Sequence, residues 1–169
     1  MPWVYDPGHS QVAWSVKYIG LTMVYGLFRK MDAQLDLEGD DPTRWSATVT
    51  IDAASIESGI DRRDEVMRGP DYFDVERFPT ITFRSKRIER DGDRYRVLGD
   101  VTLHGVTREI ALTGTHVGDG VDPQGVRRRG LSGETTIKRS DFDLHSPPLP
   151  QSMSDEVWLR IDVQATNQE

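Results

Sequence analysis

Apolar residues recur at every second position through most of this chain. The alternation is clearest at 12–18 and 157–165, and similar runs lie at 33–37, 45–51, 81–83, 95–103, 110–112 and 131–137. Successive side chains of a β-strand point to opposite faces, so a period of two predicts strands with one apolar face each. The pattern therefore predicts an all-β protein.

Several of these runs are longer than the usual strand of about 5–6 residues. Long antiparallel strands with one apolar face can bury it by closing into a barrel, and a two-sheet sandwich is the competing architecture. The interior of an eight-stranded barrel is either filled by side chains or holds one small ligand. With 169 residues, the chain is long enough for one such domain over residues 1–169.

The dipeptide His104-Gly105 separates two of the alternating runs. A two-residue turn here would pair Leu103 with Val106, and both Gly and His can adopt the positive φ that such a turn requires. The alternative is a catalytic histidine presented on a loop. The alternation on both sides favours the hairpin corner.

The segment at 61–69 breaks the β pattern and predicts a short helical insertion. Asp61 is a candidate N-cap, Asp64 and Glu65 fall where the helix dipole favours acidic side chains, and Gly69-Pro70 is a stop signal. Two other irregular segments are a glycine-rich hairpin loop at 117–130 and a proline-rich stretch at 139–154. The latter contains PPLP at 147–150 and is long enough for a lid.

Composition narrows the possible functions. The net charge is −7 and acidic and basic residues are interleaved, which does not favour nucleic-acid binding. There is no cysteine, and the four histidines have no metal-binding spacing, so we expect no metal site. No secretory signal or long apolar segment is recognisable, from which we expect a cytoplasmic protein.

Candidate catalytic chemistry is sparse. Arg63 and Asp64 on the predicted helix are candidates to bind a polar headgroup or to act as an acid–base pair, or else to cap the helix. The run Arg127-Arg128-Arg129 is either an anion-binding patch or the solvated start of a strand. The chain has no nucleophile motif, so we assign no catalytic residue.

The inward-facing apolar positions would form either a solid core or the wall of a cavity. The candidates for a cavity lining are Trp14, Val16, Tyr18, Phe28, Leu35, Phe83, Tyr95, Val97, Leu112 and Leu131.

Five segments, in order, resemble the YceI-like family of lipocalin-like polyisoprenoid-binding proteins. They are DPGHSQVAWSVKYIGLTMVYGLF (6–28), SIESGIDRRDEVMRGPDYFDVERFPTITFRS (55–85), GDVTLHGVTREIAL (99–112), DPQGVRRRGLSGETTIKRSDF (122–142) and DEVWLRIDVQA (155–165). The chain departs from the family pattern at Tyr18, where histidine is usual, and at Asp143, where glycine is common.

The resemblance implies an extended antiparallel eight-stranded barrel with a helical insertion and an apolar tunnel. The expected function is non-catalytic binding, storage or transport of a long-chain amphiphile such as a polyisoprenoid, an isoprenoid quinone or a fatty-acid derivative, with no other cofactor. Arg63, Asp64 and His104 are the candidates to hold its headgroup. The alternative is an enzyme that acts on such a lipid through these residues and Tyr18. A homodimer and transient membrane contact are further expectations, and the exported members of the family stand against a cytoplasmic location.

Overall fold

The computed structural model describes residues 2–144 and 153–167. This part of the chain holds eleven strands, one α-helix and four short 3-10 helices. The strands are β1 (Val4–Tyr5), β2 (Gln11–Tyr18), β3 (Thr22–Phe28), β4 (Met31–Asp36), β5 (Ser46–Asp52), β6 (Ile56–Glu57), β7 (Thr80–Asp91), β8 (Arg94–Leu103), β9 (Val106–Val121), β10 (Arg127–Lys138) and β11 (Glu156–Asn167). The helices are α1 (Asp61–Arg68), η1 (Pro7–His9), η2 (Pro42–Arg44), η3 (Ala53–Ser55) and η4 (Arg139–Phe142).

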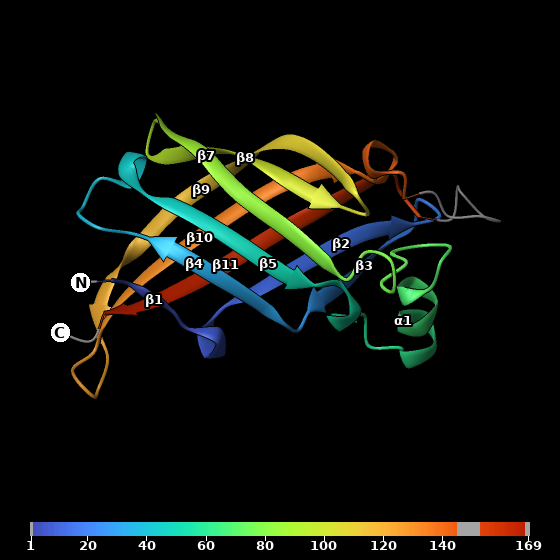
Figure 1. The fold of residues 1–169 in the computed structure, drawn as a ribbon, viewed down its shortest axis with the longest axis horizontal. Coiled ribbons are helices and arrows are strands. Elements are labelled where there is room, and N and C mark those ends of the chain that lie inside the picture. Colours follow the sequence, from blue (N-terminus) through green and yellow to red (C-terminus); the bar gives the residue numbers. More distant parts are fainter. Residues whose placement is uncertain (1, 145–152, 168–169) are drawn as a thin grey trace.

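All strands belong to one antiparallel sheet that curls around its apolar face. The strand order is β4-β5-β7-β8-β9-β10-β11-β2-β3-β6. Strand β1 pairs with the C-terminal end of β11. Figure 1 shows the strands running along the long axis of the molecule, with α1 at one end and β1 toward the other. The expected all-β, lipocalin-like architecture with a helical insertion is confirmed.

The strand count differs from the expected eight, because nine strands have six residues or more within the described part of the chain. The run TMVYGLF of β3 is apolar at most positions, so it lacks the alternation that identifies the other strands. The ladder also has two ends, at β4 and β6. Side-chain contacts join the curled sheet near β4, where the Tyr5 hydroxyl donates to the Met31 carbonyl at 3.3 Å.

The hairpin corner at His104-Gly105 is confirmed. Both residues have positive φ, 52° and 74°, and Leu103 pairs with Val106. The register continues along β8 and β9, so Gly99 pairs with Ile110. The turn therefore fixes which side chains of two long strands face the interior.

Helix α1 begins one residue earlier than predicted, because Asp61 was expected to be the N-cap. Asp61 is the first helical residue, and Ile60 takes the N-cap position without a side-chain hydrogen bond. Gly69 ends the helix as expected. The acidic side chains of the first turn, Asp61 and Asp64, thus compensate the exposed amides electrostatically rather than by capping.

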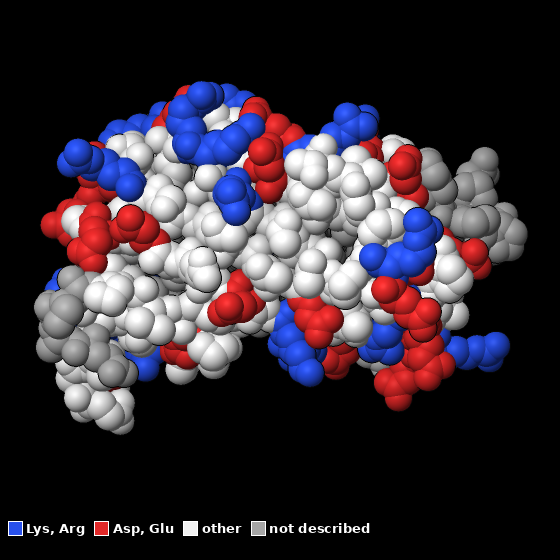
Figure 2. Space-filling view, in the orientation of Figure 1, with Lys and Arg blue, Asp and Glu red and all other residues white. Residues whose placement is uncertain are grey.

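Charged residues of both signs are distributed over the surface. Figure 2 shows acidic and basic side chains interleaved around the face that β4, β5 and β7 form, with uncharged side chains between them. This face carries no continuous basic surface of the kind that binds nucleic acid. No helix in the described residues has the length and hydrophobicity needed to cross a membrane.

Candidate functional site

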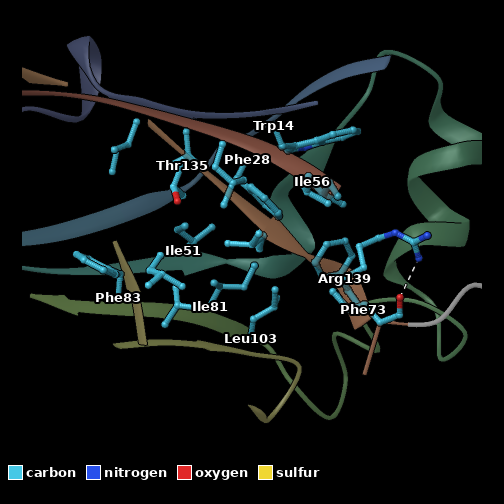
Figure 3. Close-up of a pocket in the computed structure, with 18 of the residues that line it drawn as sticks. Trp14, Phe28, Ile51, Ile56, Phe73, Ile81, Phe83, Leu103, Thr135 and Arg139 are labelled. Atoms are coloured by element: carbon cyan, nitrogen blue, oxygen red, sulfur yellow. Dashed lines mark hydrogen bonds between the residues drawn. The ribbon is translucent and has the colours of Figure 1, made fainter. Parts of the chain in front are cut away.

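The interior of the curled sheet contains two apolar cavities. The first has a volume of about 160 Å³ and extends toward α1. Its wall consists of side chains from nine strands, with further residues from α1, η4 and the loops, and includes Trp14, Phe28, Ile56, Ile81, Leu103 and Ile137. Figure 3 shows Trp14, Phe28, Ile56, Ile81 and Leu103 around a shared space, with Phe73 and Arg139 at one end and Phe83 at the other.

The second cavity has a volume of about 130 Å³ and lies farther from α1. Its wall includes Leu35, Leu37, Trp45, Tyr95, Val97 and Leu131. The two cavities have four lining residues in common, Val49, Phe83, Leu112 and Ile161. The two cavities therefore adjoin end to end, and these four side chains lie between them.

Nine of the ten candidate lining residues face these cavities. Trp14, Val16 and Phe28 line the first cavity, Leu35, Tyr95, Val97 and Leu131 line the second, and Phe83 and Leu112 line both. Whether they bind a ligand stays a prediction.

Tyr18 does not line either cavity, which corrects its assignment. It ends β2, pairs with Thr22 beside the hairpin turn and is 47% exposed. Its parity along β2 is that of the inward-facing Val16. The alternation in the sequence correctly predicts which face of the strand carries the Tyr18 side chain. It does not show that β2 extends beyond the cavities at this end, so that a side chain on the inward face is exposed there.

Arg63 and Asp64 are also absent from both cavity linings. Asp64 is buried and accepts hydrogen bonds from the Ser58 amide at 2.9 Å and its hydroxyl at 2.5 Å. Arg63 donates to the Ser58 hydroxyl at 2.7 Å and its carbonyl at 2.9 Å. The pair holds the start of α1 against the loop before it, and its assignment to a ligand headgroup stays a prediction.

His104 has a structural role at the hairpin corner, and it too is absent from the cavity linings. Its Nδ1 lies 3.1 Å from the Phe142 carbonyl oxygen, and its ring packs edge-on against Phe78 with centroids 4.8 Å apart. These contacts join the β8–β9 corner to η4 and to the loop after α1.

The arginines at 127–129 are not simply a solvated strand start. Arg129 is 2% exposed and lies between the rings of Trp3 and Trp45, 4.5 and 4.6 Å from their centroids. Its five N–H groups are engaged by the carboxylates of Asp119 and Asp40 and by backbone carbonyls of the β4–β5 loop. The Arg129 hydrogen bonds, with a smaller contribution from His116, lower the pKa of Asp119 from 3.8 to about 2, against the opposing effect of its burial.

The sequence analysis did not identify the polar side chains that line the first cavity. Tyr72, Thr135 and Arg139 contribute to its wall. Thr135 donates to the Ala111 carbonyl, and Arg139 donates to the carbonyls of Leu144, Met153 and Ser154. The position of Thr135 in an alternating run was a usable signal, whereas nothing local distinguishes Arg139 from the other arginines.

No group of three His, Asp or Glu side chains among the described residues could hold a metal ion. The glycine-rich segment forms the β9–β10 hairpin, as expected. The PPLP stretch at 147–150 lies outside the described residues.

Comparison with known proteins gives a consistent family match. The model of the YceI-like domain family matches residues 3–165. "Protein YceI" of Escherichia coli O157:H7 is 32% identical over 160 residues, which cover 95% of this chain and 83% of that protein.

Solved structures agree with this match. The crystal structure of Burkholderia cenocepacia BcnA superposes with a TM-score of 0.86 at 27% identity, covering 96% of this chain and 99% of that chain. A polyisoprenoid binding domain from Saccharophagus degradans has a TM-score of 0.76 at 16% identity, over 99% of both chains. At that identity the second likeness concerns the fold alone.

Proposed function

Because the chain belongs to the YceI-like domain family, we propose that it binds a long-chain amphiphile, such as a polyisoprenoid, an isoprenoid quinone or a fatty-acid derivative, inside its curled sheet without chemically changing it. The role is storage or transport of this cargo.

The observation that carries the proposal is the pair of apolar cavities joined end to end. They extend from Leu144 and Arg139 beside α1 to Leu37 and Trp45 at the other end of the sheet. An elongated apolar space with few polar groups suits a flexible hydrocarbon chain better than a compact polar substrate. We assign the polar end of the amphiphile to the end where Tyr72 and Arg139 lie.

The energetics agree with reversible carriage. About twenty buried chain carbons at about 0.8 kcal/mol each would give roughly 16 kcal/mol. Ordering the flexible chain and the loss of translational freedom reduce this sum substantially, so we expect micromolar to nanomolar binding. Because burial of hydrocarbon is non-directional, chain length should affect affinity more than headgroup identity.

Native mass spectrometry of protein purified from cells without detergent tests the proposal. We expect a co-purified lipid, or uptake of added isoprenoid alcohols that strengthens with chain length. Protein that is empty as purified and takes up none of the added alcohols would contradict the proposal.

The enzyme alternative lacks support from the geometry of its candidate residues. Asp64 is engaged by Ser58, His104 packs against Phe78, and Tyr18 lies at a strand end. Incubation with a bound isoprenoid, followed by mass analysis of the extracted lipid, distinguishes the two functions. Unchanged lipid is expected, and conversion that Asp64→Asn abolishes would favour the enzyme.

Partners and location follow as parts of the same proposal. A carrier of membrane lipids needs transient contact with a membrane to load or release its cargo. We retain the homodimer and the cytoplasmic location as proposals, which size-exclusion chromatography with light scattering and cell fractionation would test.

A further inference from the structure

We infer that Phe83 divides the interior into two compartments and sets the length of hydrocarbon chain that the protein holds without rearrangement. This inference rests on the proposed function and names its specificity-determining residue. The first cavity is then the primary site, and a longer chain reaches the second cavity only by displacing the Phe83 ring.

Four inward side chains at the same height along the sheet, called here the dividing level, separate the two cavities. Val49, Phe83, Leu112 and Ile161 come from β5, β7, β9 and β11, and each contributes to both cavities. On each of these strands the inward residue on one side lines only the first cavity, and the inward residue on the other side lines only the second. Ile81 and Ser85 show this on β7.

Strand β8 shows why Phe83 is the principal member of this level. Val101 and Leu103 line the first cavity, and Tyr95 and Val97 line the second, but Gly99 between them lines neither. A Cβ atom at Gly99 would lie 2.5 Å from Cζ and 2.6 Å from Cε2 of Phe83. The tip of the Phe83 ring thus occupies the space in front of the neighbouring strand that a side chain at position 99 would fill.

The view along the first cavity agrees with this arrangement. Phe83 lies at the end of the cavity opposite Arg139 (Figure 3). A chain whose polar end lies near Arg139 therefore meets Phe83 with its apolar end. The remaining three members of the level are aliphatic, so truncation of the single aromatic ring should open the largest passage.

The test uses geraniol, farnesol, geranylgeraniol and solanesol, whose chains lengthen in that order, with affinities measured by native mass spectrometry or tryptophan quenching. Each newly buried methylene corresponds to roughly a fourfold change in Kd before ordering costs. In the unmodified protein we expect affinity to rise with length and then to level off. In Phe83→Ala the rise should continue, with solanesol bound about tenfold more tightly than by the unmodified protein and geraniol little changed.

Phe28→Ala is the matched control, because Phe28 lines the first cavity only. It should weaken all probes by similar factors and leave the plateau at the same chain length. Phe83→Leu keeps the position apolar and serves if Phe83→Ala does not fold, and it should shift the plateau in the same direction.

The outcomes separate the inference from the proposed function. If the unmodified protein binds the probes but shows no plateau, or if a folded Phe83 variant keeps the original plateau, the inference is overturned and the carrier function stands. If the unmodified protein binds no probe of any length, both are overturned.

Discussion

Arg129 and Asp119 face each other across the β9–β10 ladder and are joined by two hydrogen bonds of 2.8 Å. The guanidinium is nearly inaccessible, and it lies between two tryptophan rings. Such a charge is stable in this position only because all of its donors have acceptors. The pair therefore anchors the end of the sheet that lies beyond the second cavity.

This pair predicts a specific acid sensitivity. The folded-state pKa of Asp119, about 2, is below its ordinary value of 3.8, so its contribution to stability is present above about pH 4 and is lost as the pH falls toward 2. Since the Asp119 side chain is 38% exposed, we discount the shift to about 1 kcal/mol. Chemical unfolding of Asp119→Asn should show lower stability at pH 7 and convergence with the unmodified protein near pH 2. Parallel pH profiles of the two proteins would contradict the assignment.

A second prediction concerns the close approach of Trp14 to Gly26. These residues pair across β2 and β3, and a Cβ at position 26 would lie 2.0 Å from Cζ2 of the indole. Gly26→Ala should therefore force the buried ring to move and cost about 3 kcal/mol of unfolding free energy. Gly120→Ala is the matched control, because a Cβ there meets nothing within 4 Å, and it should change stability by less than about 0.5 kcal/mol. Equal stability of the two variants in urea unfolding would contradict this account.

A third prediction separates the turn role of His104 from a chemical one. Its φ of 52° is one that Asn adopts readily and β-branched residues do not. Both His104→Asn and His104→Val lose the contacts with Phe142 and Phe78, but we expect the valine variant to be less stable by a further ~1–2 kcal/mol. Thermal unfolding measures the difference. Farnesol binding should be unchanged in both folded variants. A loss of binding common to both would show that His104 contributes to the ligand-binding site.

A fourth prediction tests the structural role of Asp64. Asp64→Asn weakens the charge-assisted hydrogen bonds from Ser58 and should cost about 1–2 kcal/mol. The control Asp61→Asn alters an exposed carboxylate in the same helical turn and should cost less than about 0.5 kcal/mol. Farnesol affinity, measured below the unfolding transition, should be the same in both. Weakened binding by folded Asp64→Asn would contradict the assignment and place the carboxylate at the ligand.

One departure from the family pattern has a backbone explanation. Asp143, where the resemblance to the family leads us to expect glycine, has a φ of 55° after η4. Glycine occupies this left-handed region without steric cost, and Asp tolerates it better than most residues. The substitution therefore preserves the turn.

The sequence determined the features that depend on local periodicity and turn chemistry. Alternation along β2, β8 and β11 identified the inward faces, and the His104-Gly105 turn set the register of two strands. The helix at 61–68 followed from its charge pattern and its Gly69 stop. These features are set by neighbours within a few residues, so they are legible without the fold.

Only the tertiary structure decided how these elements meet. The burial of Arg129 between Trp3 and Trp45 joins residues far apart in the chain, and Tyr18 falls outside the interior only because of where β2 ends. The narrowing at Phe83 likewise depends on the ring of one strand filling the space left by Gly99 on the next. Alternation specifies the face a side chain occupies, but whether that face encloses a cavity depends on how side chains from different strands fill the space between them.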